Sequence, residues 1–130
     1  MKVIDHINQA KRTLFSFEIL PPLKGKGIEA IYAGIDPLLE FEPSFINVTY
    51  HREEYSYKKV KDDLLQKVSI RRRPGTVGIC AAIMFKYGID TVPHLICGGF
   101  SKEETESALI DLQFLGIDNV LALRGDPIPG

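Results

Sequence analysis

Apolar and polar positions along the chain follow two different periods. Four short apolar runs have the composition of strands, and the segments between them carry apolar residues at helical spacing. The expected strands are residues 14–20, 44–49, 92–97 and 119–123, and the expected helices are residues 5–12, 28–41, 77–87 and 101–115. Strands that alternate with helices predict parallel strands joined by crossover helices.

Local signals sharpen several of these boundaries. Pro37 lies inside the second helical pattern, so we expect a break there. Asp5 is placed as the N-cap of the first helix. Gly88 is placed to end the third helix, and Ser101 with Glu104 three residues later forms a capping box for the fourth.

Residues 53–73 interrupt the alternation of strands and helices. Two runs, 55–60 and 64–71, flank the turn signal Lys61-Asp62-Asp63. We expect a β-hairpin in this segment, although a continuous helix over residues 57–70 also fits part of the pattern.

Two folds accommodate this order of elements: half of a (βα)₈ barrel and a doubly wound open sheet. No G-x-G-x-x-G fingerprint follows any expected strand, which counts against the dinucleotide-binding version of the open sheet. We therefore predict that residues 1–130 form a single partial domain, the N-terminal half of a (βα)₈ TIM barrel with about four parallel strands.

The composition of the chain argues against some classes of binding partner. With 45% apolar and 25% charged residues and a net charge of -1, the chain has the composition of a soluble globular protein and no basic field for nucleic acid. It has no secretion signal and no apolar stretch that could span a membrane, so cytoplasm is the expected compartment. Cys80 and Cys97 lie in apolar runs, and we expect two buried, reduced thiols.

The residues that are candidates for catalysis or binding lie where the expected strands end. In a parallel βα array the site is built at the carboxyl ends of the strands. The four strands in turn carry Glu18, Thr49, His94 and the segment Arg124-Gly125-Asp126. Each of four successive strands thus places a titratable or hydrogen-bonding group at the same, carboxyl-terminal end of the expected sheet.

Each of these groups also has a purely structural interpretation. Glu18, inside an apolar strand, is either an ion-pair partner of a base such as Arg124 or a general acid whose proton is held by apolar surroundings. His94 is either a hydrogen-bonded core residue or a ligand contact. Gly125 would let the backbone approach a flat ligand closely.

The same segments resemble a known family, the methylenetetrahydrofolate reductases. The resemblance is carried by Ser16-Phe17-Glu18 with Pro21-Pro22, by Val48-Thr49-Tyr50, and by residues 93–97 and 121–127, in family order. It spans nearly the whole chain and is closer to the longer, eukaryotic-like branch.

The resemblance implies a (βα)₈ barrel that binds FAD. By this resemblance, the enzyme would be an oxidoreductase that uses NADH or NADPH to reduce 5,10-methylenetetrahydrofolate to 5-methyltetrahydrofolate, in one-carbon metabolism and methionine biosynthesis. Glu18 would be the general acid, and Asp126 would lie by the flavin and the pterin. By the same resemblance, FAD contacts come from Thr49, His94, Leu123, Arg124, Gly125 and Asp126. The parent enzyme is expected to be a homo-oligomer.

The chain departs from the family pattern in two ways. His51 stands where many members have glycine, so no role is carried over to it. A complete barrel needs about 250 residues, so we expect the chain to be part of a longer enzyme, to bind FAD weakly and to show no turnover alone. A half-barrel would also leave open sheet edges through which it could self-associate.

Two other functions stay open at this point. Glu18, His94 and Asp126 could gather a divalent metal in a barrel hydrolase. Alternatively, the chain could be a non-catalytic module that pairs with a second copy.

Overall fold

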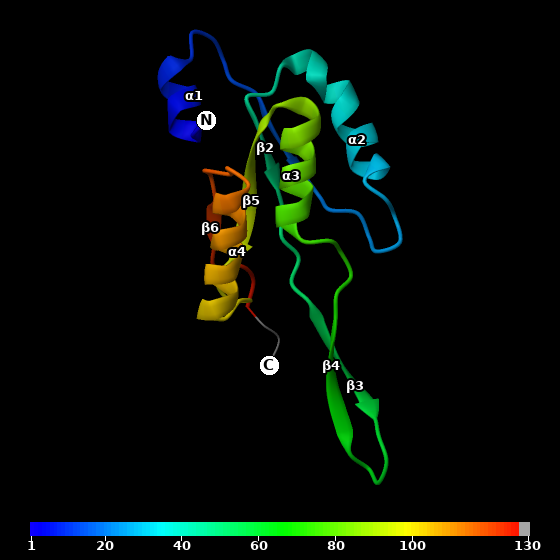
Figure 1. Ribbon diagram of the computed structural model, residues 1–130. Helices are drawn as coiled ribbons and strands as arrows, with labels where there is room; N and C mark the ends of the chain where they lie inside the picture. The colour runs from blue at the N-terminus through cyan, green and yellow to red at the C-terminus, as the bar shows by residue number, and fades with distance from the viewer. Residues whose placement is uncertain (128–130) are drawn as a thin grey trace.

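The computed structural model describes residues 1–127, and a four-stranded parallel sheet forms its centre (Figure 1). Its strands lie in the order β1–β2–β5–β6, with every neighbouring pair parallel. They are β1 (Ser16–Ile19), β2 (Phe45–Val48), β5 (Asp90–Ile96) and β6 (Leu121–Leu123). Among residues 1–127, β1 and β6 each pair with one strand, so their outer edges are open, as predicted.

The helices that connect these strands pack on one face of the sheet. They are α2 (Glu29–Ile35), which continues into the 3₁₀ helix η1 (Asp36–Phe41), α3 (Thr76–Tyr87) and α4 (Lys102–Phe114). Strands in sequence order with helices on one face are typical of a barrel, whereas a doubly wound sheet reverses its strand order and carries helices on both faces. The fold is therefore the predicted partial barrel, without closure.

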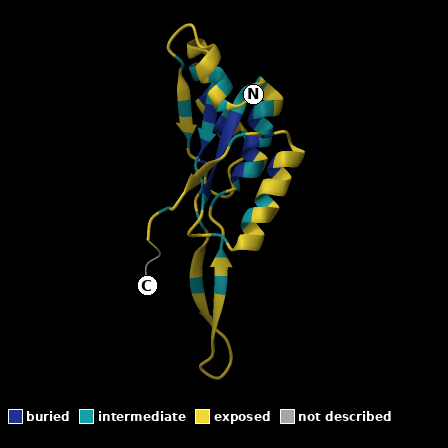
Figure 2. Ribbon diagram, turned by 90° about the vertical axis from the view of Figure 1, so that its left-hand side faces the viewer, coloured by how far each residue is buried: buried dark blue, intermediate teal, exposed yellow. Residues whose placement is uncertain are grey.

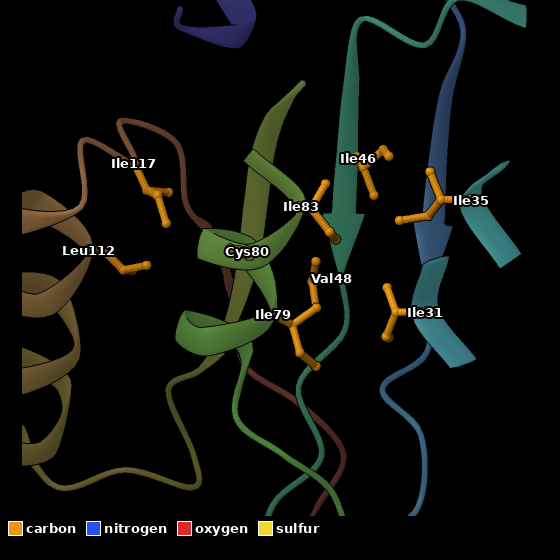
Figure 3. Packing of buried hydrophobic residues seen from close by; sticks show 9 residues of the cluster. All are labelled: Ile31, Ile35, Ile46, Val48, Ile79, Cys80, Ile83, Leu112 and Ile117. Carbon is orange, nitrogen blue, oxygen red and sulfur yellow. The ribbon is translucent and has the colours of Figure 1, made fainter. Parts of the chain in front are cut away.

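Branched aliphatic side chains fill the space between sheet and helices (Figure 3). Ile46 and Val48 point from β2 toward α2 and α3 and are fully buried. Because side chains alternate along a strand, Asn47 points to the opposite face. The register places Glu18 of β1 beside Asn47, so the two polar side chains share that uncovered face.

The hairpin interpretation of the segment after β2 is confirmed, and the continuous helix is wrong. Strands β3 (Glu54–Lys59) and β4 (Leu65–Ile70) pair antiparallel and project from the carboxyl end of the sheet (Figure 1). Most of the hairpin is exposed (Figure 2). Asp62 and Asp63 have φ values of 59° and 61°, a left-handed conformation that aspartate tolerates in turns.

Several predicted boundaries hold because they depend on local chemistry. α2 ends at Ile35, and the chain tightens into the 3₁₀ helix around Pro37. The capping box is present, because Ser101 Oγ accepts from the Glu104 amide at 3.1 Å while Glu104 Oε2 accepts from the Ser101 amide at 2.7 Å. Gly88 has a φ of 65° and donates its amide to Met84.

Other boundaries differ from the prediction. Helix α1 spans Val3–Gln9, so Asp5 lies inside its first turn and accepts from the Lys2 amide at 3.2 Å rather than acting as the N-cap. The prediction of two buried thiols is wrong for Cys97, which is exposed because it follows the end of β5 at the rim, whereas Cys80 is buried in α3. Within residues 1–127, no helix has the length and apolar character needed to cross a membrane.

Candidate functional site

A hollow of about 430 Å³ lies at the carboxyl ends of the parallel strands. All four strands, or the loops that follow them, contribute to its wall. Its lining residues are Glu18, Ile19, Leu20, Thr49, Tyr50, His51, His94 and Leu123. The structure thus brings four predicted site residues together, each from one strand or from the position directly after it: Glu18, Thr49, His94 and Leu123.

Glu18 has little apolar cover among the residues that the structure describes. Its side chain is 60% exposed, because β1 is an edge strand and Glu18 faces the side of the sheet that no helix covers. Its ion-pair contact in the structure is with His94, at 3.8 Å between Oε2 and Nε2, and not with Arg124. The carboxylate is therefore available to a ligand in the hollow.

His94 combines deep burial with an unused hydrogen-bonding group. The residue is 4% exposed, and its Nε2 atom has no hydrogen-bond partner within the described part of the chain. Buried polar nitrogens nearly always have a partner, so such a group marks a position where a ligand or water would bind. The purely structural alternative, a core histidine with satisfied nitrogens, would need a partner for Nε2 that residues 1–127 do not supply.

Thr49 and His51 form a small hydrogen-bonded group on the same wall. Thr49 Oγ1 lies 3.3 Å from the Ile19 carbonyl oxygen, to which it donates, and 3.3 Å from His51 Nε2. Because the hydroxyl proton is used on Ile19, the Nε2–H of His51 donates to the hydroxyl oxygen. Burial, followed by the charge of Arg73, lowers the pKa of His51, which favours the neutral imidazole. Sequence reasoning assigned this residue no role.

The segment after β6 lies next to the hollow but does not line it. Leu123 reaches the wall, and its carbonyl accepts from the Cys97 amide at 2.7 Å. Arg124 and Asp126 are exposed beyond the end of the strand. Gly125 has a φ of 76°, and a Cβ there would collide with Ile96, so close packing requires this glycine independently of any ligand.

Arg52 holds this segment in place, a contact that no sequence signal indicated. Its Nη2 donates to the Asp126 carbonyl oxygen at 2.6 Å, joining the loop after β2 to the loop after β6. Its Nη1 is buried and has no partner in the described residues. Gly98 packs between these loops, where an added Cβ would lie 2.9 Å from the Arg124 carbonyl oxygen. The three loops are therefore fixed to one another.

A larger groove of about 1530 Å³ adjoins the hollow, with Tyr50 in both walls. The groove runs between the hairpin, the start of α2, the first turn of α3 and one side of α4. Tyr50 packs edge-on against Phe100 at 4.8 Å between ring centroids. Burial, followed by the nearby charge of Glu53, raises the pKa of Tyr50.

The proposed metal ligands do not come together in the structure. Glu18 and His94 share the hollow, whereas Asp126 lies outside its lining. Residues 1–127 contain no group of three histidine, cysteine, aspartate or glutamate side chains placed to hold a metal ion.

Comparison with known proteins gives one consistent family. The family model "Methylenetetrahydrofolate reductase" matches residues 2–130. A "Probable methylenetetrahydrofolate reductase (NADH)" from Oryza sativa subsp. japonica is 32% identical over 100% of this chain and 20% of its own length. A "Methylenetetrahydrofolate reductase (NADH) 1" from Zea mays is 33% identical with the same coverage.

A bacterial relative is similar over a smaller part of the chain. The "5,10-methylenetetrahydrofolate reductase" of Escherichia coli (strain K12) is 29% identical over 88% of this chain and 33% of its own length. The plant matches agree with the resemblance to the eukaryotic-like branch. The chain spans about a fifth of the length of these plant relatives. On the family match, which covers all but the first residue, the chain belongs to the methylenetetrahydrofolate reductase family.

Proposed function

We propose that residues 1–130 are the N-terminal part of the catalytic barrel of a flavin-dependent reductase. The full-length enzyme would reduce 5,10-methylenetetrahydrofolate to 5-methyltetrahydrofolate with NADH or NADPH, in cytoplasmic one-carbon metabolism that leads to methionine. One observation carries the proposal: Glu18, Thr49, His94 and Leu123 line a single hollow at the end of the sheet where barrel enzymes build their sites. Three of them lie on different strands, and Thr49 directly follows a fourth strand, β2.

The wall of the hollow fits a flat ligand with a hydrogen-bonding edge, as FAD has. The unpartnered Nε2 of His94 can form a hydrogen bond with that edge, and Leu123, which is 36% exposed, supplies an apolar surface beside it. Thr49, His94 and Leu123 would contact the bound flavin, and Arg124 and Gly125 would contact it from the segment next to the hollow. When bound, FAD would accept hydride from the nicotinamide and pass it to the folate.

Glu18 is the proposed general acid. Its carboxyl group faces the hollow, where it can hold a proton for a nitrogen of the folate's five-membered ring. Protonation of that nitrogen would open the ring to the reactive iminium. The place of Glu18 in the wall of the hollow supports this role because a proton donor must reach its substrate.

Asp126 is proposed to orient the folate beside the flavin. Arg52 binds its backbone carbonyl, so the segment is held without engaging the carboxylate. An exposed carboxylate on a fixed backbone can bind a polar edge of the pterin at little cost in ordering.

The chain alone is proposed to lack part of its cofactor site. The outer edges of β1 and β6 are unpaired in the described residues, and a complete barrel needs about 250 residues. Mixing the 130-residue chain with FAD should therefore change the fluorescence of the flavin only weakly, with no turnover. Tight stoichiometric quenching would show that the chain holds a complete site.

The colour of the full-length enzyme tests the proposal. We expect a yellow protein whose visible absorption is bleached by NADH or NADPH. A colourless, chelator-sensitive hydrolase would instead support a metal site that includes Glu18 and His94. A colourless protein that is insensitive to chelators would support a non-catalytic module.

A further inference from the structure

The hairpin presents an unpaired strand edge to solvent. β3 pairs only with β4 in a two-stranded sheet, so its other edge has no partner within the described chain. The hairpin stands away from the helices and the main sheet (Figures 1 and 2). Tyr55 and Tyr57 on β3 are 61% and 64% exposed. Such an edge is a template for another strand unless it is blocked.

The sequence along this edge is complementary to itself in reverse. Residues 53–59 read Glu-Glu-Tyr-Ser-Tyr-Lys-Lys, with both acidic residues on one side of Ser56 and both basic residues on the other. When two copies run antiparallel with Ser56 opposite Ser56, every charged residue meets an opposite charge. The facing pairs are Glu53 with Lys59, Glu54 with Lys58, and Tyr55 with Tyr57, each pair occurring twice.

From this pattern we propose that β3 is a self-association surface. The partner is a second copy of the same chain, bound edge to edge about a two-fold axis at Ser56. The two hairpins together form a four-stranded antiparallel sheet. In a two-fold interface the same patch on each copy contacts its counterpart, so the patch must be complementary to itself.

Side-chain faces support the same register. Because side chains alternate along a strand, Tyr55 and Tyr57 lie on one face of the hairpin. Lys67 of β4 lies over the Tyr55 ring at 3.9 Å from its centroid. Pairing about Ser56 would place the four tyrosines of two copies side by side, and aromatic and opposite-charge pairs are among the cross-strand contacts that stabilise sheets.

The other edge of the hairpin lacks this property. β4 contains Lys67 as its one charged residue, so pairing two β4 strands about that position would place like charges opposite each other. The charge pattern therefore selects β3.

Existing contacts of the charged groups leave them able to rearrange. Glu53 accepts a hydrogen bond from the Ser69 hydroxyl at an exposed position. Glu54 pairs with Arg72 at 2.6 Å and Lys59 with Asp63 at 2.8 Å, and the side chains in both pairs are more than half exposed. Exposed ion pairs contribute little to stability, so exchanging them for pairs across the two-fold axis costs little.

Association would also stabilise the hairpin. An isolated two-stranded hairpin is only marginally stable in water, and three or more strands are needed for independent stability. A contact between two hairpins is small, so we expect a weak, concentration-dependent dimer rather than a permanent one.

A charge-swap experiment on the full-length protein tests the proposal by sedimentation over a range of concentrations. Lys58→Glu with Lys59→Glu gives an all-acidic edge, and Glu53→Lys with Glu54→Lys gives an all-basic one. Each variant alone should dimerise at least about tenfold more weakly than the wild type, and an equimolar mixture should restore the dimer. The quadruple variant, which reverses the pattern but keeps it self-complementary, should dimerise like the wild type.

Three results would overturn the inference. They are a wild-type monomer at every concentration, self-association that is insensitive to both reversals, and a mixture that behaves like its separate components. None of these depends on flavin or folate, so the proposed function is tested separately.

A cross-link fixes the register even if the charge variants fold poorly. In a Cys97→Ser background, Ser56→Cys should form an intermolecular disulfide under mild oxidation, because facing residues of an antiparallel pair lie within disulfide reach. The control variant Gln66→Cys, at an exposed position on β4, should not. Equal cross-linking of both variants would contradict the register.

Discussion

The Nε2 atom of His94 lies 3.8 Å from the Oε2 atom of Glu18, although their strands β5 and β1 are separated by β2. This distance exceeds that of a hydrogen bond, so neither group satisfies the other. A buried imidazole nitrogen and an exposed carboxylate therefore converge on one hollow, both available to a ligand.

Replacing the Glu18 carboxylate should separate the two half-reactions of the full-length enzyme. In Glu18→Gln, folate reduction should fall by about 10²–10⁴-fold, because the amide cannot donate the catalytic proton. Reduction of the flavin by the nicotinamide should be unchanged in stopped-flow measurements. Glu40→Gln, an exposed carboxylate remote from the hollow, is the control. Equal loss of both half-reactions would mean that Glu18 is structural.

Removing the charge of Asp126 should affect binding rather than folding. Asp126→Asn keeps the backbone carbonyl that Arg52 holds, so the melting temperature should stay the same. The KM for folate should rise and the flavin reduction potential should shift, because a negative charge beside the ligands is lost. A large drop in melting temperature would refute this assignment.

His94→Leu should have opposite effects on stability and on cofactor binding. The variant removes a buried nitrogen that has no partner in residues 1–127, so the free energy of unfolding without ligand should stay the same or rise by about 1 kcal/mol. FAD affinity, measured by titration of the full-length enzyme, should fall by about tenfold. Thr91→Val, on the helix-covered face of the same strand, should leave FAD affinity unchanged. Unchanged FAD affinity in His94→Leu would remove His94 from the site.

The two thiols should differ sharply in reactivity. Burial raises the pKa of Cys80 to about 12, so this thiol is both shielded and protonated at neutral pH. Cys97 is exposed at the rim. A thiol reagent applied to the folded 130-residue chain should label one cysteine rapidly, and Cys97→Ser should abolish that phase. Two rapid phases in the native chain would contradict the burial of Cys80.

Asp90 should give the fold an acid-sensitive contact at the amino end of the sheet. Burial alone would raise the pKa of Asp90, but hydrogen bonds from the terminal ammonium and from His6, at 2.6 and 2.7 Å, outweigh it and lower the pKa. A lowered carboxyl pKa adds stability above the unfolded value of about 3.9, and that stability is lost as the pH falls through the folded value. Asp90→Asn should lower the free energy of unfolding by about 1–2 kcal/mol at pH 7. It should also make that free energy fall less steeply below about pH 4 than in the wild type. The free energy of unfolding is measured by urea unfolding at several pH values. If it falls as steeply with acid in Asp90→Asn as in the wild type, Asp90 does not have this role.

Features set by local chemistry could be read from the sequence. The break at Pro37 and the capping box at Ser101 depend on residues within four positions, and both are confirmed. The convergence of Glu18, Thr49 and His94 also followed from the rule that parallel strands present their carboxyl ends together.

Features set by distant parts of the chain could not be read in this way. The exposed fraction of Glu18 depends on which strands flank β1 and on what covers that face of the sheet, and the residues of β1 set neither. Arg52 meets the carbonyl of Asp126 across 74 positions, and an arginine after a strand carries no signal of such a contact. The exposure of Cys97 likewise depends on where β5 ends.

We propose that the full-length protein transfers hydride from a nicotinamide to a folate through a site that this chain helps to form. The most direct test follows its visible spectrum anaerobically: NADH or NADPH is added first, and 5,10-methylenetetrahydrofolate second. We expect bleaching, then recovery of the oxidised spectrum with one equivalent of 5-methyltetrahydrofolate formed. Bleaching without recovery, or recovery without that product, would rule out this hydride transfer.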